Sequence, residues 1–247
     1  MTKKKNSFDE FRKSLEKMDG NLHVLDSYIP MEKQLDFFRY SELIRPKFSQ
    51  DEMENQLQIL LQDDSSELEI KHALAFLSVS REIKAFRAIE MYAQKPDAKQ
   101  TDWANLALLQ AKIALESEFS DEKQIFISTG LGGRDNKLRF YAFFKSNQLN
   151  PFSDYQKQLI EKEFAYSIEK NDGVLEEITI KDIYFSLILL ISIHEDIKNL
   201  LEATIAECNQ YGDFIDKGFM ITNVKIFDRE DIQKRLLNRE NKPEERE

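Results

Sequence analysis

The spacing of hydrophobic residues changes from a helical to a strand-like period near Glu122, and this change constrains the fold more than any other feature. Before it, apolar residues recur every three or four positions, as in amphipathic helices; after it, segments such as 124–129 alternate, as in strands. The predicted helices of the front half span 51–62, 67–78, 81–95 and 101–118, after a short amphipathic helix that ends at Gly20. We therefore predict an α+β protein with an α-helical domain at 1–120, an α+β domain at 121–240 and a charged tail at 241–247.

Local signals mark where individual helices begin. Ser66 followed three residues later by Glu69 has the spacing of a capping box, which predicts a helix start. Asp51 is the predicted cap of the preceding helix. In the back half, Asn150 before Pro151 predicts another start, because proline suits the first turn of a helix.

The front half carries one local likeness to helical repeats. The residues Ala88, Tyr92 and Pro96, followed by Trp103-Ala104-Asn105-Leu106-Ala107, resemble the junction between two tetratricopeptide (TPR) repeats, and HEAT-type helix pairs fit the same spans. Either resemblance implies a short stack of helical hairpins whose concave face could hold a peptide. The alternative is a small bundle that only packs against the second half.

The back half follows the strand at 124–129 with segments in the order β-α-β-β-α-β. The predicted strands span 138–144, 174–180, 183–193 and 219–227, with a short helix at 229–237 after the last. This order resembles the ferredoxin-like split βαβ arrangement, preceded by one extra strand. Lys181-Asp182 is an untypical hairpin turn, so a single long bent strand across 174–193 is the competing interpretation.

Composition narrows the classes of partner. The net charge of −10 and the pI of about 5.0 argue against nucleic acid as a partner, because binding phosphates needs a positive field. The single cysteine, Cys208, excludes an intramolecular disulfide, and the three histidines lack metal-ligand spacing, so no metal or cofactor is predicted. The longest apolar run, 183–193, is too short to span a membrane, and a cytoplasmic location is expected.

One loop stands out as a candidate site. Only seven glycines occur in the chain, and three of them fall within four positions. The predicted ligand- or partner-binding residues of this loop are Gly130, Gly132, Gly133, Arg134, Asp135 and Asn136. Free backbone N–H groups and an arginine there could hold a phosphate or carboxylate. The competing interpretation is a wide hairpin loop, since phosphate-binding motifs open a helix and this loop joins two strands.

Other conspicuous residues favour structural roles. Phe140, Tyr141, Phe143 and Phe144 invite comparison with the base-stacking strands of the RNA-recognition motif, but the motif's consensus glycine and basic position are missing, so core packing is predicted. The run His194-Glu195-Asp196 is predicted to cap a helix. Cys208 is predicted to be a small core residue.

These observations favour a non-enzymatic protein-protein interaction or adaptor protein, with a protein partner or self-association. No catalytic residue is predicted. Two alternatives stay open: a small anionic ligand sensor or enzyme that uses the loop 130–136, and an RNA- or ribosome-associated factor.

Overall fold

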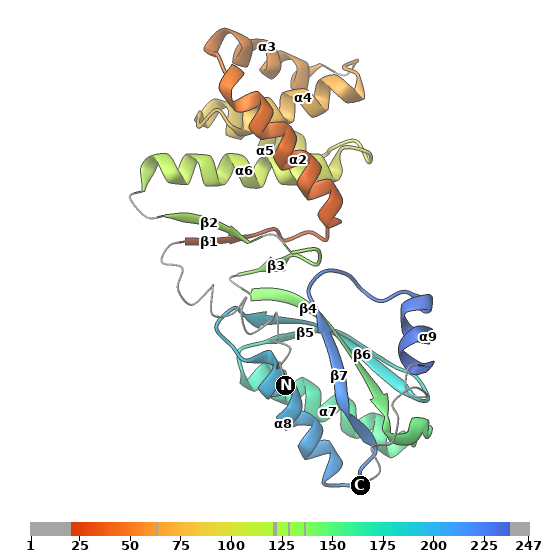
Figure 1. Cartoon of the computed structure of the whole chain (residues 1–247). Coiled ribbons are helices and arrows are strands. Elements are labelled where there is room, and N and C mark those ends of the chain that lie inside the picture. Colours follow the sequence, from red (N-terminus) through yellow and green to blue (C-terminus); the bar gives the residue numbers. More distant parts are fainter. Residues whose placement is uncertain (1–20, 63, 121–122, 128, 136, 238–247) are drawn as a thin grey trace, which may run out of the picture. The chain divides into compact units, whose positions relative to one another are not determined.

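The computed structural model describes residues 21–62, 64–120, 123–127, 129–135 and 137–237 (Figure 1). The chain divides into two compact units, residues 1–136 and 137–247. The helix predicted before Gly20 and the tail at 241–247 lie outside the described residues, and the domain ranges 1–120 and 121–240 stay predictions.

The first unit is mainly helical. Its helices are α2 (Met31–Ile44), the 3-10 helix η1 (Arg45–Lys47), α3 (Gln50–Leu61), α4 (Glu67–Ser78), α5 (Ile83–Gln94) and α6 (Thr101–Phe119). The predicted capping box is confirmed, because Ser66 accepts a hydrogen bond from the Glu69 N–H and donates its own N–H to the Glu69 carboxylate. The cap of α3 is Ser49 instead of Asp51: the Ser49 hydroxyl accepts from the N–H of Glu52, so α3 begins one residue before Asp51.

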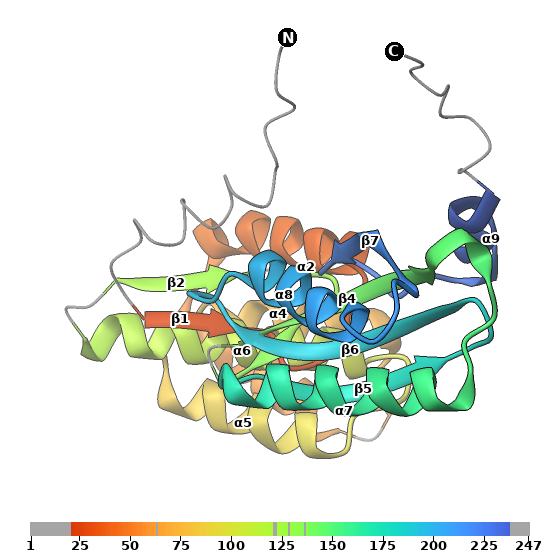
Figure 2. The ribbon, with the colours of Figure 1, turned by 90° about the horizontal axis from the view of Figure 1, so that it is seen from below.

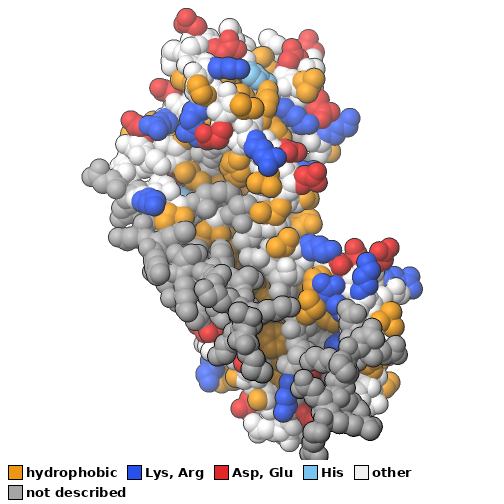
Figure 3. Space-filling view, in the orientation of Figure 1, with side chains coloured by type: hydrophobic (Ala, Val, Ile, Leu, Met, Phe, Trp, Pro, Cys, Tyr) orange, Lys and Arg blue, Asp and Glu red, His pale blue; other side chains and the backbone are white. Residues whose placement is uncertain are grey.

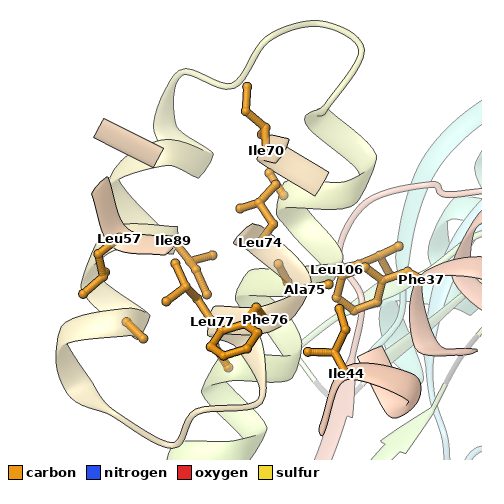
Figure 4. Close-up of a cluster of buried hydrophobic side chains, with 14 of the residues drawn as sticks. Phe37, Ile44, Leu57, Ile70, Leu74, Ala75, Phe76, Leu77, Ile89 and Leu106 are labelled. Atoms are coloured by element: carbon orange, nitrogen blue, oxygen red, sulfur yellow. The ribbon is translucent and has the colours of Figure 1, made fainter. Parts of the chain in front are cut away.

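Helix α4 forms the centre of the first unit, and Figure 4 shows its side chains among those of the other helices. Every residue from Ala73 to Ser78 is buried, and α4 contacts α2, α3, α5 and α6. In a repeat array each unit contacts only its neighbours. One helix surrounded by four others is instead a globular bundle, so the prediction of TPR- or HEAT-like repeats is wrong.

The extra strand is β2 (Gln124–Ile127), and its partner lies at the start of the described chain. It pairs in parallel with β1 (Asn21–Val24), with Val24 opposite Ile127. The sequence analysis assigned no strand to residues 21–24. Parallel pairing needs no local turn, so nothing near residue 21 announces a partner a hundred positions away.

The second unit has a ferredoxin-like fold. Its elements are β4 (Lys137–Ser146), the 3-10 helix η2 (Asn147–Leu149), α7 (Asp154–Lys170), β5 (Val174–Ile180), β6 (Tyr184–Ser192), α8 (Ile197–Asn209), β7 (Ile215–Thr222) and α9 (Arg229–Leu237). The strand order is β5-β6-β4-β7, and each neighbouring pair is antiparallel. The α+β class and the βαββαβ order are therefore confirmed.

Three local predictions in this unit are settled. Strands β5 and β6 form a hairpin in which Lys181 donates its N–H to the carbonyl of Tyr184, so the single bent strand is excluded. Helix α7 is capped by Ser153 through a second capping box with Gln156, which places its start after the predicted cap at Asn150. Strand β7 ends at Thr222 and not at Phe227, because the chain there leaves the sheet.

The sheet of the second unit has two different faces. Helices α7 and α8 contact each other and lie on one side of it (Figures 1 and 2). On that side Phe144 packs against Phe164 of α7 and stacks on Phe185 of β6 at a centroid distance of 4.5 Å. We call the opposite side, which α7 and α8 leave uncovered, the open face. None of the described helices is both long and apolar enough to cross a membrane.

Candidate nucleic-acid interface

The glycine loop packs against its own unit. Gly132 has a φ of +69°, and a Cβ placed there would lie 2.3 Å from the carbonyl oxygen of Leu25 and 2.9 Å from that of Ser27. The N–H of Gly133 donates to the same Leu25 carbonyl at 2.8 Å, and the Thr129 hydroxyl donates to the Gly132 carbonyl. The glycine at position 132 is thus required by close approach to the chain segment that follows β1.

Substitution of Gly132 tests this explanation. Gly132→Ala is expected to lower the free energy of unfolding by about 2 kcal/mol or more, because a left-handed backbone and a backbone contact both oppose the new methyl group. Gly212→Ala is the matched control: its φ is +117°, yet nothing lies within 4 Å of the added Cβ. Equal losses in urea unfolding for the two variants would show that the contact with Leu25 and Ser27 is not the cause.

Only the last part of the described loop is exposed to solvent. Gly130 and Gly133 are buried, whereas Arg134 and Asp135 are exposed and form an ion pair of 3.8 Å. Asn136 lies outside the described residues. The loop connects β2 to β3 (Gly133–Arg134). Its role as a site for an anionic ligand or a partner stays a prediction.

A row of basic and aromatic side chains lies along the open face on the central strand β4. Alternate residues of a strand point to the same side, so this row consists of Lys137, Arg139, Tyr141, Phe143 and Lys145. At about 3.4 Å per residue it extends over about 27 Å. Its neighbours on β6 include Tyr184, which stands directly opposite Lys145, and Ser186, which stands opposite Phe143. The open face therefore combines cations with aromatic rings along one line.

Acidic side chains at the edge of the sheet hold two of the cations. Arg139 makes a two-pronged contact with Glu176 on β5, at 2.5 Å from Nε and 2.9 Å from Nη2. Lys137 lies 3.1 Å from Asp172, in the turn before β5. The Asp172 side chain is 85% exposed, so its pair with Lys137 is worth at most about 1 kcal/mol and a competing anion can replace it. The Arg139–Glu176 pair is more shielded, with side chains 16% and 24% exposed, and its two-pronged geometry makes it the stronger of the two.

The aromatic residues in the middle of the row are less exposed than Lys145 and its neighbour Tyr184 on β6. Phe143 and Tyr141 are buried, while Tyr184 and Lys145 are only half-buried. The Tyr184 ring lies 5.4 Å from the ring of Phe143. Burial raises the pKa of the Tyr141 hydroxyl, and a hydrogen bond with Ser186 acts in the opposite direction. Tyr141 is therefore a neutral, hydrogen-bonding ring at neutral pH.

The two aromatic residues of the row contact the segment 223–237, which we call the arm. It contains α9 and the residues that join it to β7. Its Phe227 ring lies 4.9 Å from Tyr141 and 6.2 Å from Phe143. The Arg235 guanidinium lies 3.8 Å from the centre of the Phe227 ring, and Arg235 also contacts the Met220 sulfur at 3.0 Å. Figure 3 shows basic and acidic side chains close together in the region of α9.

The remaining predicted residues have structural roles. Asp196 caps α8 by accepting from the N–H of Asn199, which confirms the predicted capping. Cys208 is buried, as predicted, and burial raises the pKa of its thiol to about 12. Among the described residues, no group of three or more histidine, cysteine or acidic side chains could hold a metal ion.

Comparisons with known proteins find likeness only at the level of structure. No protein family matches the sequence, and no curated protein matches it. The crystal structure of a putative transposase from Deinococcus radiodurans R1 is similar at 15% identity with a TM-score of 0.37, covering 45% of this chain and 97% of that one. The REP-associated tyrosine transposase bound to a REP hairpin is similar at 8% identity with a TM-score of 0.32, covering 47% of this chain and 67% of that one.

These neighbours correct the functional predictions. One is described as a putative transposase and the other as a tyrosine transposase, which contradicts the prediction of a non-enzymatic interaction or adaptor protein and the repeat-protein descriptions attached to it. The tyrosine transposase is bound to a REP hairpin, which contradicts the prediction that nucleic acid is an unlikely partner. That prediction relied on the net charge of the whole chain, and net charge does not report a local row of cations such as the one on β4.

The row on β4 was not predicted, although the sequence of residues 137–145 carries a signal for it. The four aromatic residues Phe140, Tyr141, Phe143 and Phe144 are all buried, which confirms the predicted core packing. The alternation of a strand separates them: Phe140 and Phe144 face α7 and α8, whereas Tyr141 and Phe143 share the open face with the cations. Every second residue from Lys137 to Lys145 is basic or aromatic, and this alternation is the sequence signal of the row.

Proposed function

We propose that the protein binds single-stranded nucleic acid on the open face of the sheet in its second unit. The observation that carries the proposal is the row on β4, in which Lys137, Arg139 and Lys145 share one side with Tyr141 and Phe143. Cations along a line can contact successive phosphates, and rings between them can stack on bases.

The aromatic side chains favour a single strand over a duplex. Bases in a duplex are stacked on one another, whereas bases in a loop or an unpaired segment can turn outward onto a protein ring. Tyr184 is the accessible ring of the face, and Lys145 stands directly opposite it on β4. This pair is where we place the first base and its adjoining phosphate.

The acidic partners of the row set the strength of binding. A phosphate that contacts Arg139 must compete with Glu176, and one that contacts Lys137 must compete with Asp172. We therefore expect moderate affinity that depends strongly on salt, in keeping with the net charge of −10.

Fluorescence anisotropy with a labelled 12-nucleotide single strand tests the proposal. Three phosphate contacts predict a slope of about −2 for log K against log salt concentration, or a loss of about 15-fold in affinity between 50 and 200 mM salt. The duplex of the same sequence should bind more weakly. Equal binding of strand and duplex, or no binding at 50 mM salt, would overturn the proposal.

A cytoplasmic location, predicted from the sequence, is part of the same proposal.

A further inference from the structure

The arm makes few contacts with the sheet, and most of them depend on one side chain. Phe227 is the one buried residue in 223–237, and α9 contributes none. Val224 and Ile226, on either side of Lys225 in the same segment, are 51% and 47% exposed. A segment held by one buried ring and by the contact of Arg235 with Met220 on β7 has a small area to lose when it leaves.

The contacts of Phe227 are those that an unpaired base would make at the same place. Its ring packs edge-on against Tyr141 and at a tilt against Phe143, and the guanidinium of Arg235 lies 3.8 Å from its centre. Aromatic rings and an arginine side chain are the groups on which proteins stack bases. Phe227 therefore occupies the position on Tyr141 and Phe143 where we propose that a base stacks.

Charged contacts hold the arm in this position. Asp231 pairs with Lys225 and with Arg235, so it connects these two cations of the arm to each other. Asp228 caps α9 by accepting from the N–H of Asp231 at 2.8 Å. These bonds lie within the arm, and they keep Arg235 on Phe227 without adding contacts to the sheet.

We infer that the arm is a displaceable cover, in which Phe227 takes the place of a nucleobase on Tyr141 and Phe143 until a single strand replaces it. This inference rests on the proposed function. With the arm in place, the accessible binding surface consists of Tyr184 and Lys145. With the arm released, this surface extends along β4 to Tyr141. Arm docking and full occupation of the row by a strand then exclude each other.

Two variants weaken the arm in different ways. Phe227→Ala removes its anchor, and Asp231→Asn removes the carboxylate that holds Lys225 and Arg235. Both are expected to raise the affinity for the 12-nucleotide strand about tenfold, the gain expected if the arm is docked about nine-tenths of the time in the parent protein. Glu230→Gln is the control for Asp231→Asn, because it removes an equal charge from the same helix turn, where the exposed Glu230 carboxylate lies 3.9 Å from the Lys234 ammonium.

Hydrogen exchange of the amides in 223–237, measured without nucleic acid, shows whether each variant releases the arm. Faster exchange together with tighter binding, and neither change in Glu230→Gln, is the expected result. Faster exchange with unchanged or weaker binding overturns the inference, because the arm is then no cover. If neither the parent nor any variant binds the strand, the proposed function itself fails, and so does the inference that the arm competes with the strand.

Discussion

A protein carrying Tyr184→Ala and Lys145→Glu is expected to bind the 12-nucleotide single strand about 100-fold more weakly than the parent. A base stacked on an aromatic ring contributes about 1–3 kcal/mol, and reversing the neighbouring charge removes a phosphate contact as well. At about 1.4 kcal/mol for each factor of ten, these losses correspond to two orders of magnitude. Anisotropy titrations at 100 mM salt measure the change.

The chain supplies a matched control for this variant. Tyr166 and Lys170 lie one helical turn apart on α7, with the ammonium 5.7 Å from the ring centre, and Tyr166 is exposed. Tyr166→Ala with Lys170→Glu makes the same chemical change on the side of the sheet that faces away from the row. It should leave the affinity within about twofold of the parent. Equal losses in the two double variants would mean that binding follows the net charge and not the open face.

A Phe144→Ala protein is expected to lose about 3–5 kcal/mol of unfolding free energy, the usual cost of emptying a buried phenylalanine site. Phe144 is fully buried and contacts Phe164, Phe185 and Phe219, so its removal opens a cavity between the sheet and α7. Urea unfolding monitored by circular dichroism measures the loss.

Phe119→Ala is the corresponding exposed control, since Phe119 is 74% exposed at the end of α6. Its effect should stay within about 0.5 kcal/mol. A loss below about 1 kcal/mol for Phe144→Ala would contradict the assignment of Phe144 to the face of the sheet that α7 and α8 cover. It would also undermine the placement of Tyr141 and Phe143 on the open one, because both assignments depend on the same alternation along β4.

The sequence predicted those parts of the fold that depend on neighbouring residues. Ser66 and Glu69 mark the start of α4 because a capping box needs only residues three apart. The order of strands and helices after Lys137 likewise follows from local periodicity, and it was enough to indicate the ferredoxin-like fold. The parallel pairing of β1 with β2 was missed, because its partners are distant in the chain.

The candidate site needed information that composition cannot supply. The charge of the whole chain masked the row on β4, in which Asp172 and Glu176 at the sheet edge pair with Lys137 and Arg139. The position of Phe227 against Tyr141 could not be predicted either, because Phe227 reads as the last residue of a strand until the sheet shows that β7 ends at Thr222. Conversely, the conspicuous glycine at position 132 is explained by a contact with the Leu25 carbonyl.

Photo-crosslinking with a 12-nucleotide strand that carries 5-iodouracil tests the central claim most directly, because the activated base reacts with the aromatic side chain on which it lies. The exposed tyrosines Tyr155, Tyr166 and Tyr211 provide an internal comparison within the same unit. We predict that peptide mapping finds the cross-link at Tyr184, with Tyr141 joining it in the Phe227→Ala protein. Cross-links at Tyr155, Tyr166 or Tyr211, with none at Tyr184, would contradict binding on the open face.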